Sequence, residues 1–179
     1  MSWKEKVFEE KMQPYIDNIY YNCFNNIKKI ERSNRETNNN NRTMFLDKEL
    51  GVDTIITLSN GSILTLQEKT LQYSKKHFQQ FTFEYYNDPK TKEVGEWFKL
   101  AAQFYFFGYA NKEKNGYSQY LILNIPLLRL FLNGKNLENY LKFNPPPAKA
   151  NFYAIPFKKL DKNIIYKHKQ INQYATKNK

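Results

Sequence analysis

Apolar residues recur at intervals of three or four along the N-terminal part of the chain. They are Phe8, Met12, Ile16, Ile19, Cys23, Ile27 and Ile30. This spacing places side chains on one face of an α-helix. The pattern predicts a helical N-terminal region over residues 1–31, kinked or divided at Pro14, because proline cannot donate the backbone hydrogen bond that a helix interior needs.

A different pattern follows between Gly51 and Lys69. Two runs rich in β-branched and aliphatic residues flank the turn Ser-Asn-Gly-Ser, whose central pair is Asn60-Gly61. Asn-Gly between two apolar runs is a strong local signal for a hairpin. We therefore expect a β-hairpin that is apolar in the middle and polar at its open end.

The remaining pattern predicts further strands and helices. Residues 44–50 are compatible with a short strand or a helical turn. We expect strands over 81–86, 120–125 and 153–157, the last at a sheet edge if it includes Pro156, and helices over 93–110, 127–132 and 137–141. This order predicts an α/β or α+β fold in which helices flank a central mixed β-sheet.

Length and charge refine this picture. A chain of 179 residues suits one domain, and segment 31–42, which lacks apolar residues and contains an asparagine run, is expected to be a loop. The net charge is +11, and the C-terminal region 146–179 carries eight lysines against one aspartate. A chain this basic favours a polyanionic partner, with nucleic acid ahead of a membrane surface.

Cysteine and histidine usage narrows the possible chemistry. The single cysteine, Cys23, excludes an internal disulfide framework and fits a reducing interior. No run approaches the roughly 18 apolar residues of a membrane span, and no signal peptide opens the chain. We expect a soluble, intracellular, cytoplasmic protein with no membrane partner. The histidines, His77 and His168, are far apart, so a zinc site is not expected.

Polar residues of complementary chemistry meet at the base of the hairpin. Asp53 lies at the start of the first strand, and Gln67, Glu68 and Lys69 lie near the end of the second. Phosphodiester hydrolysis needs an activated water and neutralised charge on the phosphoryl oxygens, and Mg²⁺ held by a few oxygen ligands provides much of this. A neighbouring lysine can orient the water. The group predicts a site for Mg²⁺ or Mn²⁺ in a nuclease.

The spacing of these residues has a counterpart in a known superfamily. Gly51-x-Asp53 followed by Gln67-x-Lys69 across a hairpin resembles the PD-(D/E)XK nucleases, and within them is similar to the Mrr-type restriction endonuclease branch. The resemblance spans roughly residues 44–125. It departs from the superfamily pattern at Val52, which stands in the place of proline, and at Gln67, which stands in the place of an acid.

The resemblance implies a fold, an activity and roles for the site residues. It implies a restriction-endonuclease-like core and metal-dependent endonuclease cleavage of DNA. Asp53 and Gln67 would bind the metal, with the backbone carbonyl of Glu68, and Lys69 would be the catalytic lysine. A further carboxylate would complete the site. The candidates are Asp47, Glu49, Glu9, Glu10 and Glu31, with Glu84, Glu93 and Glu96 from later segments.

The length of the hairpin loop tests this assignment. A two-residue loop at Asn60-Gly61 places Asp53 opposite Glu68. A three-residue loop with Gly61 in the left-handed region pairs Leu58 with Ser62 and places Asp53 opposite Gln67. Residues directly opposite share a face of the sheet. We expect the three-residue loop, because it groups Asp53, Gln67 and Lys69 as the motif requires.

Residues outside the motif are candidates for contact with DNA. The basic ones are Lys75, Lys76, His77, Lys158, Lys159, Lys167 and Lys169. The tyrosines Tyr85, Tyr86, Tyr105 and Tyr109 either stack on bases or fill the core. One active site cuts one strand, so double-strand cleavage would need a homodimer or two binding events. The alternative function is a non-catalytic nucleic-acid-binding module on a degenerate nuclease fold, which the glutamine at position 67 motivates.

Overall fold

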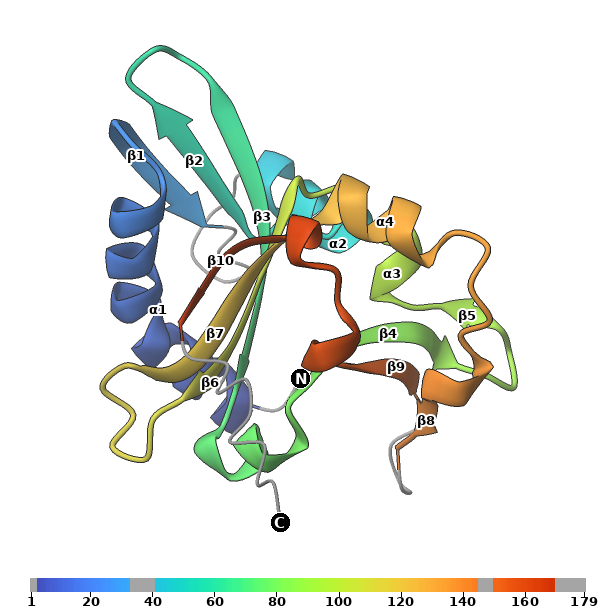
Figure 1. Cartoon of the computed structure of the whole chain (residues 1–179). Coiled ribbons are helices and arrows are strands. Elements are labelled where there is room, and N and C mark those ends of the chain that lie inside the picture. Colours follow the sequence, from blue (N-terminus) through green and yellow to red (C-terminus); the bar gives the residue numbers. More distant parts are fainter. Residues whose placement is uncertain (1–2, 33–40, 145–149, 170–179) are drawn as a thin grey trace.

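Two β-sheets pack against each other in the computed structural model, which describes residues 3–32, 41–144 and 150–169 (Figure 1). The larger sheet is mixed: its neighbouring strands are antiparallel except for β3 and β6, which run parallel. In spatial order its strands are β1 (Ile27–Arg32), β2 (Thr54–Leu58), β3 (Ile63–Leu71), β6 (Phe104–Ala110), β7 (Tyr117–Asn124) and β10 (Ile165–Lys169).

The smaller sheet is antiparallel and comes mainly from the chain between β3 and β6 and from the C-terminal third. Its strands in spatial order are β5 (Glu93–Val94), β4 (Gln80–Asp88), β9 (Asn151–Pro156) and β8 (Leu141–Phe143). The helices are α1 (Trp3–Cys23), α2 (Asn41–Leu50), α3 (Glu96–Lys99) and α4 (Ile125–Leu132), with 3-10 turns η1 (Tyr73–Phe78), η2 (Glu138–Tyr140), η3 (Phe157–Lys159) and η4 (Lys162–Ile164).

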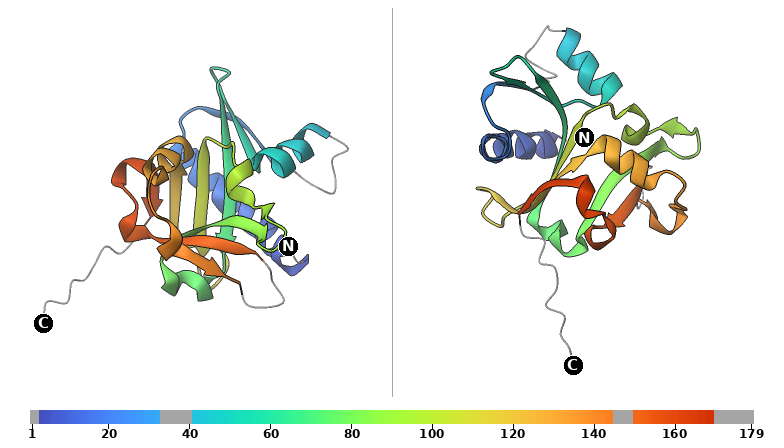
Figure 2. Two further views of the ribbon diagram at one scale, coloured as in Figure 1. Left: turned by 90° about the vertical axis from the view of Figure 1, so that its right-hand side faces the viewer. Right: turned by 45° about the horizontal axis from the view of Figure 1, so that its top comes forward.

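The large sheet separates two apolar cores. Helix α1 covers one face, as the two further views also show (Figure 2). The core on that side includes Met12, Ile16, Tyr20, Phe24, Ile56, Leu66, Phe106 and Ile122. The small sheet and α4 cover the opposite face over a core rich in aromatic rings, among them Phe81, Phe83, Tyr105, Phe107, Tyr109 and Tyr153. The expected mixed sheet flanked by helices is therefore present.

The N-terminal helix is shorter than the apolar spacing predicts. It runs through Pro14 and stops at Cys23, and the chain turns at Asn26, whose φ of 58° lies in the left-handed region. Ile27 and Ile30 belong to strand β1. The expected helix over residues 1–31 was therefore wrong beyond Cys23.

Of the expected loop 31–42, positions 33–40 lie outside the described residues, and Asn41 begins α2.

The expected aromatic-rich helix over 93–110 was also wrong. Only Glu96–Lys99 is helical, and Phe104–Ala110 forms the central strand β6. This strand is covered by α1 on one face and by the small sheet on the other, so six of its seven residues are buried. A strand covered on both faces loses the alternation of apolar and polar residues that identifies a half-buried strand.

Other segments agree with the sequence pattern to different extents. The strands expected at 81–86 and 120–125 correspond to β4 and β7, and the helix at 127–132 corresponds to α4. The helix expected at 137–141 is instead the turn η2 leading into β8. Strand β9 lies between β4 and β8 rather than at an edge, and β10 follows it. No helix in the described ranges has the length and apolarity to cross a membrane.

Candidate functional site

The β2–β3 hairpin has the three-residue loop that the sequence predicts. The backbone N–H of Leu58 donates to the carbonyl of Ser62 at 2.9 Å, and Gly61 has a φ of +84°. A Cβ atom on Gly61 would meet nothing within 4 Å. Glycine is favoured there by its backbone conformation and not by packing.

The regular β2–β3 register extends to the pair of Thr54 with Leu66. Asp53 lies at the end of this ladder, where its N–H also donates to the Leu66 carbonyl at 2.9 Å. Asp53 therefore lies next to the segment that carries Gln67. Gln67 and Lys69 are two residues apart on β3 and so share a face. The structure thus places Gln67 and Lys69 on one face of the large sheet, and Asp53 at the adjoining end of β2.

That face is the one covered by the small sheet. Gln67 pairs with Tyr105 of β6 and Lys69 pairs with Phe107, and both aromatic residues belong to the core between the sheets. The polar ends of Gln67 and Lys69 therefore lie at the margin of an apolar, water-excluding region. Electrostatic interactions are stronger there than in open solvent.

The backbone of Glu68 contacts Asp53, whereas its side chain lies under α1. Its backbone N–H donates to Oδ2 of Asp53 at 2.9 Å. Its side chain lies under α1, where Oε1 accepts hydrogen bonds from Tyr20, Thr54 and Arg32. The N–H and C=O of one strand residue point to the same side, so the Glu68 carbonyl is directed to the strand edge at which Asp53 lies. This geometry is compatible with the predicted backbone role of Glu68.

A further carboxylate, that of Glu96, enters the site from α3. The Tyr105 hydroxyl donates to Oε1 of Glu96 at 2.7 Å, and the Glu84 backbone N–H also donates to this carboxylate. Gly95 makes the approach possible, because a Cβ there would lie 2.7 Å from the Glu84 carbonyl oxygen. Burial raises the pKa of Glu96, whereas the positive charge of Lys69 opposes the rise. Glu96 and Lys69 therefore act on each other electrostatically.

Burial and neighbouring carboxylates also raise the pKa of Asp53. Burial raises the pKa of its carboxyl well above the ordinary value, and the Glu68 N–H opposes this rise. The carboxylates of Glu68, Asp47 and Glu96 raise the Asp53 pKa further. Asp47, the predicted additional ligand, is thus near enough to interact with Asp53 from α2. Several carboxylates and one lysine form a site that a bound cation would stabilise.

One buried atom supports a ligand role for Gln67. Its Oε1 oxygen is buried and has no hydrogen-bond partner among the described residues. A buried acceptor without a partner is costly and is rare in folded proteins. Within the described part of the chain, no group of three or more His, Cys, Asp or Glu side chains could hold a metal ion. An ion here would depend on the Gln67 amide oxygen and on backbone oxygen as well as on carboxylate.

The other carboxylates considered lie farther from this site. Glu9 and Glu10 belong to α1, which covers the opposite face of the sheet. Glu31 is in strand β1 and forms an exposed ion pair with Lys29. Glu93, in the edge strand β5, accepts a hydrogen bond from Asn87.

The predicted DNA-contacting residues fall into two regions. Lys75, Lys76 and His77 form much of η1, directly after β3. The ammonium groups of Lys75 and Lys76 lie about 6.0 and 5.8 Å from the ring centroids of Phe78 and Tyr73. The start of η3 lies beside the end of η1, because Phe157 donates its N–H to the Gln79 carbonyl at 3.0 Å. Lys158 and Lys159 of η3 therefore belong to this region.

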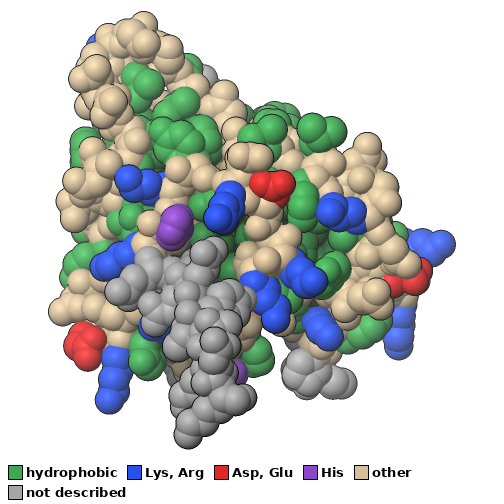
Figure 3. All heavy atoms as spheres, viewed as in Figure 1, with side chains coloured by type: hydrophobic (Ala, Val, Ile, Leu, Met, Phe, Trp, Pro, Cys, Tyr) green, Lys and Arg blue, Asp and Glu red, His purple; other side chains and the backbone are tan. Residues whose placement is uncertain are grey.

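Lys167 and Lys169 lie elsewhere, on the outer strand β10. This strand is separated from β3 by β6 and β7, a distance of roughly 14 Å at the usual strand spacing. Both side chains are exposed, and the face on which β10 lies in front carries many Lys and Arg and few acidic side chains (Figure 3). The structure therefore does not bring these two lysines to the hairpin base.

Sequence reasoning named Glu96 as one of several possible carboxylates but did not connect it to Tyr105. Tyr105 was considered for base stacking or for the core, and its ring is fully buried. The spacing of the two residues along the chain gave no signal for their hydrogen bond.

Comparison of the chain with family models, with curated proteins and with solved structures finds no match.

Proposed function

We propose that this protein is a metal-dependent endonuclease that hydrolyses phosphodiester bonds in DNA. The observation that supports the proposal is the geometry at the hairpin base, where the Glu68 N–H bond to Oδ2 of Asp53 holds Asp53 beside the segment that carries Gln67 and Lys69. This is the grouping that the Gly51-x-Asp53 and Gln67-x-Lys69 pattern requires. The antiparallel strands β1, β2 and β3, followed by β6 parallel to β3, are compatible with a restriction-endonuclease-like core.

The residues at the hairpin base would divide the work of hydrolysis. The Asp53 carboxylate, the Gln67 amide oxygen and the Glu68 carbonyl would hold Mg²⁺ or Mn²⁺. When bound, such an ion supplies charge neutralisation at the phosphoryl oxygens and lowers the pKa of a bound water. Lys69 would orient the attacking water or neutralise charge on the scissile phosphate.

Glu96 and Tyr105 would act as positioning residues. The Tyr105 hydroxyl fixes one oxygen of Glu96, and the charge of Glu96 interacts with Lys69. This interaction would hold the lysine ammonium over the face that carries Gln67. A fixed, partly buried charge requires less rearrangement during reaction than a solvated one.

The basic surface supports DNA as the substrate. The net charge of +11 and the lysines of η1, η3 and β10 supply contacts to phosphates. Binding that relies on such contacts weakens steeply as salt concentration rises. Retention of DNA affinity at high salt would therefore argue against this part of the proposal.

Incubation with supercoiled plasmid DNA tests the function. We expect nicking that requires Mg²⁺ or Mn²⁺, that stops in EDTA, and that Asp53→Ala abolishes. The matched control is Asp161→Ala, which removes an exposed aspartate outside the site that caps η4 by accepting from the Asn163 N–H. Nicking by the Asp53→Ala protein at the normal rate would contradict the assignment of Asp53.

A non-catalytic nucleic-acid-binding module is the second candidate function. It is favoured by the glutamine at position 67 and by the absence, within the described residues, of a group of three or more His, Cys, Asp or Glu side chains that could hold a metal. DNA binding in gel-shift assays, without cleavage in any divalent metal, would support this alternative and reject the enzyme.

A further inference from the structure

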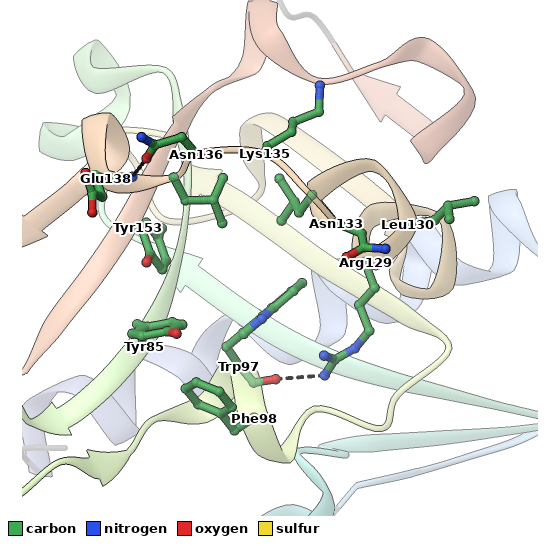
Figure 4. Close-up of a pocket in the computed structure, with 12 residues that line it drawn as sticks. Tyr85, Trp97, Phe98, Arg129, Leu130, Asn133, Lys135, Asn136, Glu138 and Tyr153 are labelled. Atoms are coloured by element: carbon green, nitrogen blue, oxygen red, sulfur yellow. Dashed lines mark hydrogen bonds between the residues drawn. The ribbon is translucent and has the colours of Figure 1, made fainter.

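An aromatic pocket lies next to helix α3, the helix that also carries Glu96 of the candidate site. It has a volume of about 710 Å³ and is formed by residues of β4, α3, α4, β9 and the segment after α4 (Figure 4). Its walls include Tyr85, Trp97, Phe98, Arg129, Lys135 and Tyr153. The volume falls within the range of about 300–1,000 Å³ that is usual for small-ligand sites.

One wall of the pocket is held rigidly. The Trp97 ring centroid lies 4.4 Å from the Phe83 ring centroid and 4.4 Å from the Arg129 guanidinium. The guanidinium also donates to the backbone carbonyls of Trp97 at 2.7 Å and Leu100 at 2.8 Å. Arg129 therefore joins α4 to α3 and fixes the position of Trp97.

The adjoining part of the wall presents aromatic surface to solvent. The Phe98 side chain is 47% exposed, although its ring lies only 4.7 Å from that of Tyr85. The Tyr85 ring is in turn 4.8 Å from the ring of Tyr153. In the close-up, Tyr85 and Phe98 lie on one side of the space, with Tyr153 and Trp97 around it (Figure 4). Exposed aromatic surface in a concave site indicates a binding role.

The charges at the pocket favour an anionic strand. Arg129 and Lys135 supply two positive charges, against one negative charge from Glu138. Trp97 directly follows Glu96, so the pocket and the candidate site share helix α3. A nucleic-acid strand bound at the candidate site could therefore reach these rings along α3.

We propose that this pocket binds an unpaired nucleobase of a nucleic-acid strand, which stacks on Phe98 and Tyr85. The identity of the ligand as nucleic acid rests on the proposed function. Stacking on aromatic rings tolerates every base, because each base has a π-face. The pocket would therefore recognise single-stranded or locally opened nucleic acid without selecting a base sequence.

Tryptophan fluorescence tests the proposal without cleavage. The chain has two tryptophans, so Trp3→Phe leaves Trp97 as the only one. In EDTA, a short single-stranded oligothymidylate should quench Trp97 emission with saturation, and a blunt duplex of equal length should quench it less. In the same background Phe98→Leu and Tyr85→Leu should each raise the dissociation constant at least about tenfold.

A matched control separates stacking from general loss of aromatic surface. Phe143→Leu changes a residue of β8 that is 68% exposed and does not line the pocket, so it should leave the dissociation constant unchanged. Thermal melting by circular dichroism establishes that each variant is folded. Equal affinity of the Phe98→Leu, Tyr85→Leu and parent proteins, or equal quenching by the duplex, would overturn the proposal.

The pocket and the nuclease function can fail separately. Base-dependent quenching without metal-dependent nicking would retain the pocket and reject the enzyme. Nicking that is unaffected by Phe98→Leu, together with no quenching of Trp97, would retain the enzyme and reject the pocket. A dimer that dissociates on the Phe98→Leu change would show that a second copy of the chain, and not a base, covers these rings.

Discussion

Replacement of Glu68 by glutamine should destabilise the fold while leaving the candidate site on the other face intact. Oε1 of Glu68 accepts from Tyr20 at 2.9 Å, from Thr54 at 2.7 Å and from Arg32 at 3.2 Å, and Oε2 accepts from Arg32 at 3.2 Å. The Glu68 side chain is only 11% exposed. These bonds link α1, β1, β2 and β3, because Tyr20 belongs to α1, Arg32 to β1, Thr54 to β2 and Glu68 to β3. Arg32 also pairs with Asp17 of α1.

The expected loss follows from these contacts. Glutamine has the same shape, but its NH₂ group can only donate, so one position now faces an Arg32 N–H donor. Loss of a hydrogen bond to a charged group costs about 1.5–3 kcal/mol, and outright rupture of a buried ion pair costs about 3–5 kcal/mol. Since Asp17 still balances Arg32, we expect a loss of about 2–4 kcal/mol in the free energy of unfolding.

Urea denaturation followed by circular dichroism measures this loss. The matched control is Glu31→Gln in the neighbouring strand β1, where the ion pair of Glu31 with Lys29 is exposed. The control should change stability by less than about 0.5 kcal/mol. Folded Glu68→Gln protein should still nick DNA, because the Glu68 side chain lies under α1 and acts on Asp53 only through its charge, whose removal lowers the pKa of Asp53. A Glu68→Gln protein as stable as the Glu31→Gln protein would refute the reasoning.

Three further changes test the site itself. Asp53→Asn should stabilise the metal-free protein, since the raised pKa of Asp53 makes its ionised form unfavourable in the fold. The gain, measured by urea denaturation across pH, should be complete above that raised pKa and should vanish below the pKa of Asp53 in the unfolded chain. Gly95→Ala should cost about 1–3 kcal/mol in the same assay, because its Cβ would collide with the Glu84 backbone. Tyr105→Phe removes the hydroxyl that opposes the rise in the Glu96 pKa, so it should raise that pKa further. The acidic limb of the pH–rate profile for cleavage should then move to higher pH, and an unchanged profile would contradict the role of Tyr105.

Local features of the hairpin could be predicted from the sequence. The Asn60-Gly61 pair predicts a turn, and Gly61 has the positive φ that the three-residue loop needs. The choice of three residues over two came from the resemblance and not from the pair itself. Alternation then determines which residues of a strand share a face. For this reason the shared face of Gln67 and Lys69 followed from short-range rules.

Features that depend on distant segments could not be predicted in this way. The strand β6 was mistaken for part of a helix because both of its faces are buried, by α1 and by the small sheet. The position of Glu96 depends on the close approach of Gly95 to the Glu84 backbone. The pairing of β10 with β7 joins segments about forty residues apart, which no local pattern in β10 specifies.

The role of Lys69 is the most direct test of the account as a whole. Initial rates of plasmid nicking in Mg²⁺ should be compared for the parent protein, for Lys69→Ala and for Lys142→Ala, which removes an exposed lysine of β8. We expect Lys142→Ala to match the parent and Lys69→Ala to be slower by at least about 100-fold, as for other losses of a preorganised charge in an active site. Nicking by folded Lys69→Ala at the parent rate, or nicking that persists in EDTA, would contradict the central claim.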